Sequence, residues 1–352
     1  MIQRTPVSIE ARLTDAGNRS WQELLSSSVT SPQELLARLD LPADKWLAGA
    51  EAGHRLFEVR VPEPFLARME KGNPDDPLLR QVLPLNLETL PAEGFVKDPL
   101  QEDSAIQATG LIRKYHSRAL LMVTGQCAIN CRYCFRRHFP YEEQRLSPAD
   151  RQRVLETLEA SPEINEVIFS GGDPLAVNDR LLSQWASDIS SIPHIRRIRL
   201  HTRLPVVIPQ RICDSLLEWI SSTPVQVVMV LHINHPREID GATRQALNSL
   251  RAAGVTLLNQ SVILRGVNDS ADVLEDLSEA LFEAGVLPYY LHAFDQVAGA
   301  QHFDVPDEEA RILARELLSR LPGFLVPRLV REVPGKTSKT PIDLLQTVSD
   351  HE

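Results

Sequence analysis

From Ala119 onward, short apolar segments alternate with amphipathic segments at intervals of about 30 residues, and this alternation strongly constrains the fold. The apolar segments are rich in β-branched residues and lie at 119–124, 166–170, 198–202, 225–233, 256–264 and 288–294. Helical periodicity is clearest between them, at 148–159, 180–189, 210–220, 243–253 and 272–284. Such alternation forms right-handed βαβ units around a parallel sheet. We therefore predict an α/β fold, a partial (βα)6-type barrel, with its chemistry at the carboxyl ends of the strands.

The same pattern predicts three regions. Residues 1–105 form an N-terminal, mainly helical region, with helical periodicity at 21–39 and 62–71. Residues 106–330 form the barrel, and residues 331–352 form a short C-terminal segment that closes the site. Spacing alone identifies no catalytic residue in the first region.

Composition excludes several classes of protein. The 352 residues include 47 acidic and 37 basic side chains, a balance that argues against a protein that coats nucleic acid. No apolar run approaches the roughly 20 residues that a membrane helix needs, and the first residues lack the apolar core of a signal peptide. We therefore predict a cytoplasmic protein, in which clustered thiols are metal ligands or redox groups rather than disulfides.

Three of the four cysteines, Cys127, Cys131 and Cys134, follow the first predicted barrel strand as C-x3-C-x2-C. A structural zinc site needs four ligands, and here the fourth would have to be His138 or Cys213. Three thiolates fit better with a 4Fe–4S cluster in which one iron is free to bind a substrate or cofactor. Structural zinc stays the alternative. We interpret Cys213, which lies in a helical pattern, as a small core residue.

With aromatic residues at Tyr133 and Phe135, the triplet resembles the signature of the radical S-adenosylmethionine superfamily. The resemblance implies that the open iron binds the methionine part of S-adenosylmethionine. It also implies that an electron from the cluster cleaves the sulfonium and produces a 5′-deoxyadenosyl radical. The signature does not identify the reaction, because many chemistries share it.

A glycine pair, Gly171 and Gly172, follows the next predicted strand in the sequence VIFSGGDPL. Glycine lets the backbone approach a ligand closely, although a tight turn capped by Asp173 would also explain the pair. One βα unit after the cysteines, the segment resembles the superfamily's glycine motif. The resemblance implies that Gly171, Gly172 and Asp173 bind S-adenosylmethionine.

A longer match covers residues 111–341, about two-thirds of the chain. Its segments are RKYHSRALLMVTGQC, CFRRHF, SGGDPL, HTRLPVVIPQRI, HINHPRE, NQSVILRGVND and PYYLHAFD. Together they resemble the lysine 2,3-aminomutase family. The resemblance implies an isomerase that needs pyridoxal 5′-phosphate as a further cofactor and converts free L-lysine to β-lysine.

The resemblance also implies residues that hold pyridoxal phosphate. Lys339, in the sequence SKTP, matches the lysine that attaches the cofactor, and Lys336 is the alternative. Lys114, Tyr115 and Arg118 fall where the phosphate is bound. Arg136 falls where an arginine meets the substrate carboxylate or the cofactor, and a guanidinium fork suits either anion.

Recognition of lysine requires carboxylates at the far end of the pocket, opposite the ε-ammonium group. Asp295 matches the first aspartate of the family, and Glu332 stands where the family has the second. The resemblance further suggests that His232 and Gln260, with Asn234, contact the adenosyl group or the cofactor. The alternative for each is a core polar group with its hydrogen bonds satisfied.

Fermentative members of the family carry a C-terminal extension with further cysteines, whereas this chain ends eleven residues after Pro341. It resembles the shorter branch that modifies translation elongation factor P, for which a ligase uses β-lysine, typically the R enantiomer. The implied partners are free lysine, that ligase and an electron donor of the flavodoxin or ferredoxin type. The alternatives are a fermentative-type aminomutase, a radical enzyme without pyridoxal phosphate acting on another substrate, and a non-catalytic zinc protein.

Overall fold

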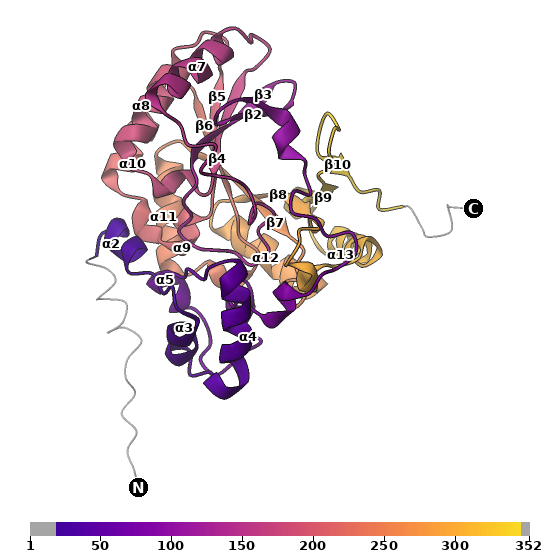
Figure 1. Ribbon diagram of the computed structural model, residues 1–352. Coiled ribbons are helices and arrows are strands. Elements are labelled where there is room, and N and C mark those ends of the chain that lie inside the picture. Colours follow the sequence, from indigo (N-terminus) through magenta and orange to yellow (C-terminus); the bar gives the residue numbers. More distant parts are fainter. Residues whose placement is uncertain (1–18, 346–352) are drawn as a thin grey trace.

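The computed structural model describes residues 19–345, whose strands form one ten-stranded sheet in the order β1 to β10 (Figure 1). Neighbouring strands from β3 to β9 are parallel. The six predicted strands are β3 (Arg118–Thr124), β4 (Glu166–Gly171), β5 (Arg197–Thr202), β6 (Gln226–Leu231), β7 (Thr256–Val262) and β8 (Leu287–His292). Because β1 and β10 are the two edges of this sheet, the barrel is partial. The predicted α/β fold with a parallel sheet is confirmed.

Helices cover the outer face of the sheet, as α7, α8 and α10 do in Figure 1. The helices of the barrel are α7 (Pro148–Glu159), α8 (Asp179–Ser190), α9 (Leu204–Val207), α10 (Asp214–Ser222), α11 (Gly241–Ala252), α12 (Ala271–Glu283) and α13 (Asp307–Arg320). Their starts are set by capping side chains: Ser147 and Asp150 form a capping box on α7, and Asn178 caps α8. The helix α8 then buries Leu182, Trp185 and Ile189 against the sheet.

The helix predicted at 210–220 begins later than expected. Residues Pro209–Arg211 form a 3-10 turn, and α10 starts at Asp214 with Cys213 as its N-cap residue. Cys213 is therefore half-buried at a helix end, 3.3 Å from the Ser215 hydroxyl, and packs against the margin of the hydrophobic core that was predicted to contain it.

Antiparallel strands at both edges were not predicted. The strands β1 (Ile106–Ala108) and β2 (Leu111–Tyr115) extend the sheet beyond β3. At the other edge, β10 (Thr340–Pro341) pairs with β9 (Arg328–Arg331). These edges position predicted site residues, because Lys114 lies in β2, Glu332 follows β9 and Lys339 precedes β10.

The N-terminal helices pack at one end of the barrel, shown in indigo in Figure 1. They are α2 (Trp21–Ser26), α3 (Pro32–Arg38), α4 (Ala43–Leu56), α5 (Glu63–Leu66) and α6 (Pro77–Arg80). The periodicity at 21–39 is split by Val29, which forms an isolated bridge with Val61. Phe65 and Leu78 belong to the same buried cluster as the barrel strands. The boundaries of the three regions stay a prediction.

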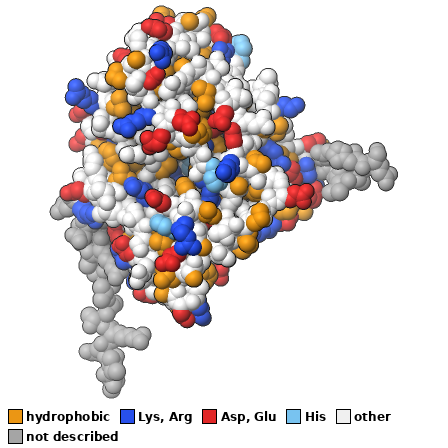
Figure 2. All heavy atoms as spheres, viewed as in Figure 1, with side chains coloured by type: hydrophobic (Ala, Val, Ile, Leu, Met, Phe, Trp, Pro, Cys, Tyr) orange, Lys and Arg blue, Asp and Glu red, His pale blue; other side chains and the backbone are white. Residues whose placement is uncertain are grey.

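On the face shown in Figure 2, acidic and basic side chains are intermixed with hydrophobic ones. Within residues 19–345, no helix is both long and apolar enough to span a bilayer.

Candidate active site

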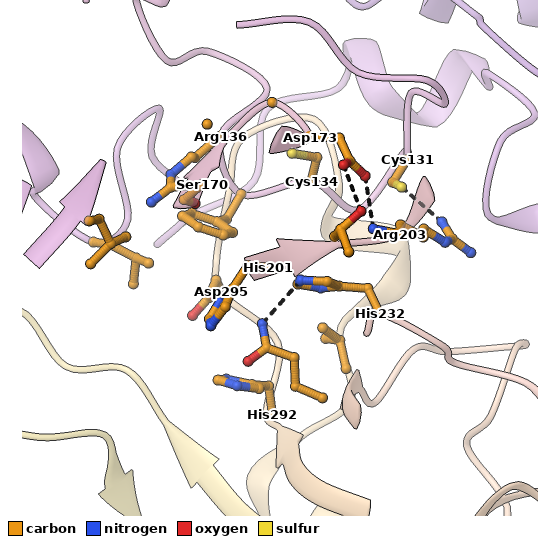
Figure 3. A pocket seen from close by; sticks show the side chains of 18 of the residues that line it. Cys131, Cys134, Arg136, Ser170, Asp173, His201, Arg203, His232, His292 and Asp295 are labelled. Atoms are coloured by element: carbon orange, nitrogen blue, oxygen red, sulfur yellow. Dashed lines mark hydrogen bonds between the residues drawn. The ribbon is translucent and has the colours of Figure 1, made fainter. Parts of the chain in front are cut away.

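One cavity at the carboxyl ends of the strands collects the predicted site residues (Figure 3). Its lining includes Cys127, Cys131, Cys134, Gly171, Gly172, Asp173, His232, Gln260, Lys114, Tyr115, Arg118, Arg136, Asp295, Glu332 and Lys339. Segments more than 200 positions apart in the chain therefore meet, as in the 2.7 Å ion pair between Lys114 and Glu332. The individual roles assigned to these residues stay predictions.

The cysteine loop leaves the end of β3 and turns tightly between Cys131 and Cys134, whose backbone O and N are 3.0 Å apart. Burial raises the pKa of Cys127 and raises that of Cys134 to about 11, so the bare thiols hold their protons at neutral pH and metal binding must release them. Across residues 19–345, no three His, Cys, Asp or Glu side chains converge as ligands of a single ion. Thiolates of a 4Fe–4S cluster bind different irons, and three thiols on one loop fit that donor set.

Gly171 and Gly172 have a structural reason that the sequence did not reveal. A Cβ atom on Gly171 would lie 2.1 Å from the Thr124 carbonyl oxygen, and one on Gly172 would lie 2.3 Å from that of Gln126. Gly171 also has φ of +123°, a backbone conformation that other residues rarely adopt. The pair thus lets the end of β4 pack directly against the start of the cysteine loop.

Asp173 fastens the neighbouring loop. Its carboxylate accepts hydrogen bonds from the Thr202 hydroxyl at 2.6 Å and from the backbone N–H groups of Arg203 at 2.8 Å and Leu204 at 3.0 Å. It also caps the turn that begins at Pro174, through the Leu175 N–H. The turn-cap interpretation of Asp173 therefore describes its contacts, and its predicted contact with S-adenosylmethionine stays a prediction.

A buried carboxylate that the sequence did not reveal, Glu102, lies beside the predicted anion-binding cations. Arg136 donates to it from Nε at 2.6 Å and from Nη2 at 2.8 Å, and the Lys114 ammonium lies 2.8 Å away. Burial alone would raise the pKa of Glu102, but the positive charges of Arg136 and Lys114 hold it at about 2. Arg136 also donates to the Ser170 hydroxyl at 3.0 Å, so its guanidinium is fixed at the end of β4.

The β2–β3 turn forms a cradle suited to an anion. The Arg118 guanidinium lies 4.3 Å from the centre of the Tyr115 ring. Burial and the nearby Glu332 carboxylate raise the pKa of Tyr115, and no acceptor in the described part of the chain, Glu332 included, lies in good hydrogen-bond geometry to its buried hydroxyl. An unsatisfied hydroxyl beside a cation fits a phosphate oxygen.

Glu332 lies between two ammonium groups. Its Oε1 accepts a hydrogen bond from Lys114 at 2.7 Å, and its Oε2 accepts one from Lys339 at 2.8 Å. Burial alone would raise its pKa, but these two charges hold the pKa of Glu332 far below the usual range. Lys336 is exposed and does not line the cavity, so the geometry favours Lys339 as the cofactor-attaching lysine.

Asp295 follows β8 and lines the same cavity as Glu332. Burial, and then repulsion by Glu332, raises the pKa of Asp295 to about 7. The carboxyl is therefore only partly ionised at neutral pH. An incoming ammonium group would favour its ionised form, which makes Asp295 a suitable partner for a cation.

Three histidines line the cavity from three strands (Figure 3). The predicted pair, His232 and Gln260, are in contact, with 3.4 Å between the two Nε2 atoms. The sequence did not single out His201 at the end of β5 or His292 at the end of β8. Burial lowers the pKa of all three, that of His232 to about 3, so the rings are neutral. The Nε2 atoms of His201 and His292 have no hydrogen-bond partner among the described residues.

Asn234 is a satisfied core group, which supports the structural alternative for it. It is 1% exposed, and its side-chain amide donates to the Tyr133 hydroxyl at 2.8 Å and to the side-chain Oε1 of Gln81 at 3.1 Å. Its own side-chain oxygen accepts a hydrogen bond from the Val262 N–H.

This arrangement of a cysteine loop above a parallel partial barrel defines a radical SAM protein, and the family model "Radical SAM superfamily" matches residues 121–277. The chain is 52% identical to L-lysine 2,3-aminomutase from Escherichia coli, over 94% of this chain and 97% of that protein. It is 49% identical to the Haemophilus influenzae protein of the same name, over 92% and 95%. The chain belongs to the L-lysine 2,3-aminomutase family of isomerases.

More distant proteins also match. The L-lysine 2,3-aminomutase of Clostridium subterminale is 32% identical over 94% of this chain and 79% of that protein. A solved radical SAM methyltransferase from Sphaerobacter thermophilus is 17% identical, covers 63% of this chain and 68% of that chain, and has a TM-score of 0.45. The sequence relatives alone carry the family assignment.

Proposed function

We propose that this protein isomerises free L-lysine to β-lysine by moving the amino group from C2 to C3. The observation that carries the proposal is that one cavity holds a three-cysteine loop, an ion-paired Lys339 and the two carboxylates Asp295 and Glu332. The L-lysine 2,3-aminomutases of Escherichia coli and Haemophilus influenzae support the choice of substrate.

Three cofactors would supply the reactive chemistry. A 4Fe–4S cluster on Cys127, Cys131 and Cys134 together with S-adenosylmethionine would supply a radical that takes hydrogen from C3, and pyridoxal phosphate would carry the migrating nitrogen. The cradle of Tyr115 and Arg118 would hold its phosphate, and Lys339 would attach it. The unsatisfied Tyr115 hydroxyl supports this assignment.

The chain's own groups orient the substrate. Arg136, held by Glu102 and Ser170, presents a fixed guanidinium for the substrate carboxylate or the cofactor. Asp295 and Glu332 present negative charge for the ε-ammonium, with Asp295 losing its proton as the ammonium arrives. A substrate that ends in a carboxylate would meet like charge there and be rejected.

The remaining lining keeps the site protected. The rings of His201, His232 and His292 are neutral, so they offer hydrogen bonds to S-adenosylmethionine or the cofactor without adding a charge. A reactive radical requires that water be kept away from it, and bound cofactors and substrate would displace water from this cavity.

The test is anaerobic incubation of the purified chain with L-lysine, S-adenosylmethionine, pyridoxal phosphate and dithionite, followed by chiral analysis of the products. Formation of β-lysine that depends on S-adenosylmethionine, pyridoxal phosphate and dithionite supports the proposal. Borohydride trapping with peptide mapping should place the cofactor on Lys339. A chain that carries zinc without iron or sulfide, or that gives no cofactor adduct, contradicts it.

We propose further that the product is (R)-β-lysine, which a cytoplasmic ligase attaches to elongation factor P, and that a flavodoxin or ferredoxin supplies the electron. The higher identity to the Escherichia coli protein than to the Clostridium subterminale protein, 52% against 32%, supports this branch. Deletion of the gene should abolish β-lysylation of the factor, as measured by mass spectrometry. An exclusively (S)-configured product, or an unchanged factor, contradicts it.

A further inference from the structure

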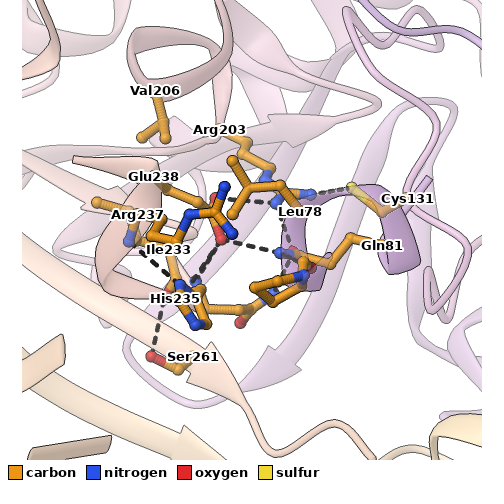
Figure 4. Close-up of polar contacts among 12 residues, drawn as sticks. Leu78, Gln81, Cys131, Arg203, Val206, Ile233, His235, Arg237, Glu238 and Ser261 are labelled. Atoms are coloured by element: carbon orange, nitrogen blue, oxygen red, sulfur yellow. Dashed lines mark hydrogen bonds and ion pairs between the residues drawn. The ribbon is translucent and has the colours of Figure 1, made fainter. Parts of the chain in front are cut away.

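Arg203 is a buried cation next to the cysteine loop that the proposed function does not use. It follows β5 directly, is 5% exposed and lines the cavity. Its Nη1 donates a hydrogen bond to the Cys131 Sγ atom at 2.8 Å (Figure 4). The guanidinium therefore faces one of the three thiols that would ligate the cluster.

The guanidinium is held in this position from several sides. Its Nη2 donates to Gln81 Oε1 at 2.6 Å and to Glu238 Oε2 at 2.9 Å. The rings of Phe65 and Tyr133 lie 5.2 and 5.7 Å from it. Because Gln81 and Phe65 come from the N-terminal helical part of the chain, that part reaches the cysteine loop through Arg203.

Glu238 is the counter-charge of Arg203 and is itself completely buried. Its other oxygen accepts hydrogen bonds from the Asn234 N–H at 3.0 Å and from the Gln81 side chain at 3.1 Å, as the network in Figure 4 shows. The carboxylate is thus fixed behind the guanidinium, on the far side from Cys131. Removing the positive charge of Arg203 and removing the negative charge of Glu238 should therefore change the electrostatic potential at the Cys131 sulfur in opposite directions.

Hydrogen bonds to ligand sulfurs and nearby charges set the potentials of iron–sulfur clusters. When a low-potential one-electron donor reduces the cluster, negative charge increases at the ligand sulfurs. An N–H donor with a positive charge, 2.8 Å from Sγ, stabilises that reduced state. We propose that Arg203 is a positioning residue that holds Cys131 and raises the reduction potential of the cluster, with Glu238 limiting the rise. This inference rests on the proposed function in taking Cys131 as a cluster ligand.

The test compares the parent chain with Arg203→Met and Glu238→Gln after anaerobic reconstitution, using redox titration followed by electron paramagnetic resonance. Arg203→Met should lower the equilibrium constant for reduction about tenfold, which is about 59 mV for one electron. Glu238→Gln should raise it by a smaller factor, because Arg203 loses its counter-charge. General loosening of the site would not give shifts of opposite sign.

Arg211→Met is the matched control. Arg211 is fully buried and paired with Asp179, but it lies outside the cavity, so the potential should stay at the parent value. Iron content is measured for every variant. If Arg203→Met does not retain iron, Arg203→Lys replaces it and should shift the potential downward by less. Equal potentials in the parent, the Arg203 variant and Glu238→Gln, each with full iron content, overturn the inference. A parent chain without a reducible cluster overturns the proposed function instead.

Discussion

Two halves of the cavity are held together by different interactions. The cysteine half consists of residues 124–134 with the ends of β4 and β5. The lysine half contains Lys114, Asp295, Glu332 and Lys339. In the cysteine half, backbone packs on backbone through the glycine pair, and Asp173 ties the adjoining loop by hydrogen bonds. In the lysine half, ammonium and carboxylate groups neutralise one another. The cysteine half depends on close backbone packing and the lysine half on ion pairs. We therefore expect added side-chain volume to disrupt the first, and changes of charge or pH to disrupt the second.

The largest effect is expected where the lysine half would attach its cofactor. Lys339→Ala should reduce turnover at least a thousandfold, because the other lysine of the cavity lining, Lys114, is already ion-paired with both Glu102 and Glu332. Lys336→Ala, three residues away and exposed, is the control and should keep parent activity. Product analysis gives the turnover of each variant, and cofactor absorbance shows whether pyridoxal phosphate is attached. Equal loss in the two variants would contradict the assignment.

In the cysteine half, Gly171→Ala should destabilise the fold by about 3 kcal/mol or more. The added Cβ would meet the Thr124 carbonyl at 2.1 Å in a backbone conformation already unfavourable for alanine. Gly241→Ala has open space and is the control. Denaturant unfolding of the iron-free chains compares them. A Gly171 variant as stable as the parent would show that β4 and the cysteine loop can separate at little cost.

Glu102 lies where the two halves meet, because it binds Lys114 of the lysine half and also Arg136, which donates to Ser170 at the end of β4 in the cysteine half. Glu102→Gln should raise KM for lysine about tenfold or more, since Arg136 would lose the charge that orients it. Glu163→Gln, which breaks the ion pair with Arg113 away from the cavity, should leave KM unchanged. Steady-state kinetics with lysine as the varied substrate measure KM for both variants. A raised KM in Glu163→Gln with an unchanged KM in Glu102→Gln would contradict the role given to Glu102.

The smallest effect is a pH dependence confined to the lysine half. Asp295 keeps its proton in the folded chain up to about pH 7, whereas an unfolded aspartate loses it near its ordinary value of 3.8. The stability that this proton contributes is therefore full below about pH 4 and is lost as the pH rises through 7. Asp295→Asn should flatten this dependence in unfolding experiments at pH 5 and 8. The same steep dependence in the variant would exclude Asp295 as its source.

Lysine binding should show the opposite pH trend. Because the ammonium favours ionised Asp295, KM for lysine should rise by up to about tenfold for each pH unit below 7. This dependence should be absent in Asp295→Asn. A KM that depends on pH equally in both chains would place the responsible group elsewhere.

The sequence predicted the barrel because each inner strand is an apolar run between turns, as in Val167–Phe169. It did not predict β2, the second strand of the sheet, whose sequence LIRKY mixes apolar and charged residues. Glu102 and Arg203 were missed for a related reason. A lone charged residue has no periodicity, and its meaning comes only from partners far away in the chain, here Lys114 and Arg136 or Cys131.

For the glycine pair, the sequence predicted where the loop lies but not why it needs two glycines. Its sequence VIFSGGDPL predicted a loop that does line the cavity, but the reason for two glycines lay in the backbone of Thr124 and Gln126, more than 40 positions earlier. The start of α10 was placed too early, because the helical pattern begins at residue 210 whereas the turn at Pro209–Arg211 delays the helix to Asp214.

The ion pair between Lys114 in β2 and Glu332 after β9 joins strands that each lie one position in from opposite edges of the open sheet. The contact between these two parts of the barrel is therefore an ion pair between side chains. Separating them breaks this ion pair and no backbone hydrogen bonds of the sheet. A lysine molecule carries the same ammonium group as Lys114. If Glu332 binds the ε-ammonium group as proposed, lysine binding exchanges one cation for another on the same carboxylate, and occupancy of the pocket would then be linked to the contact between β2 and the segment after β9.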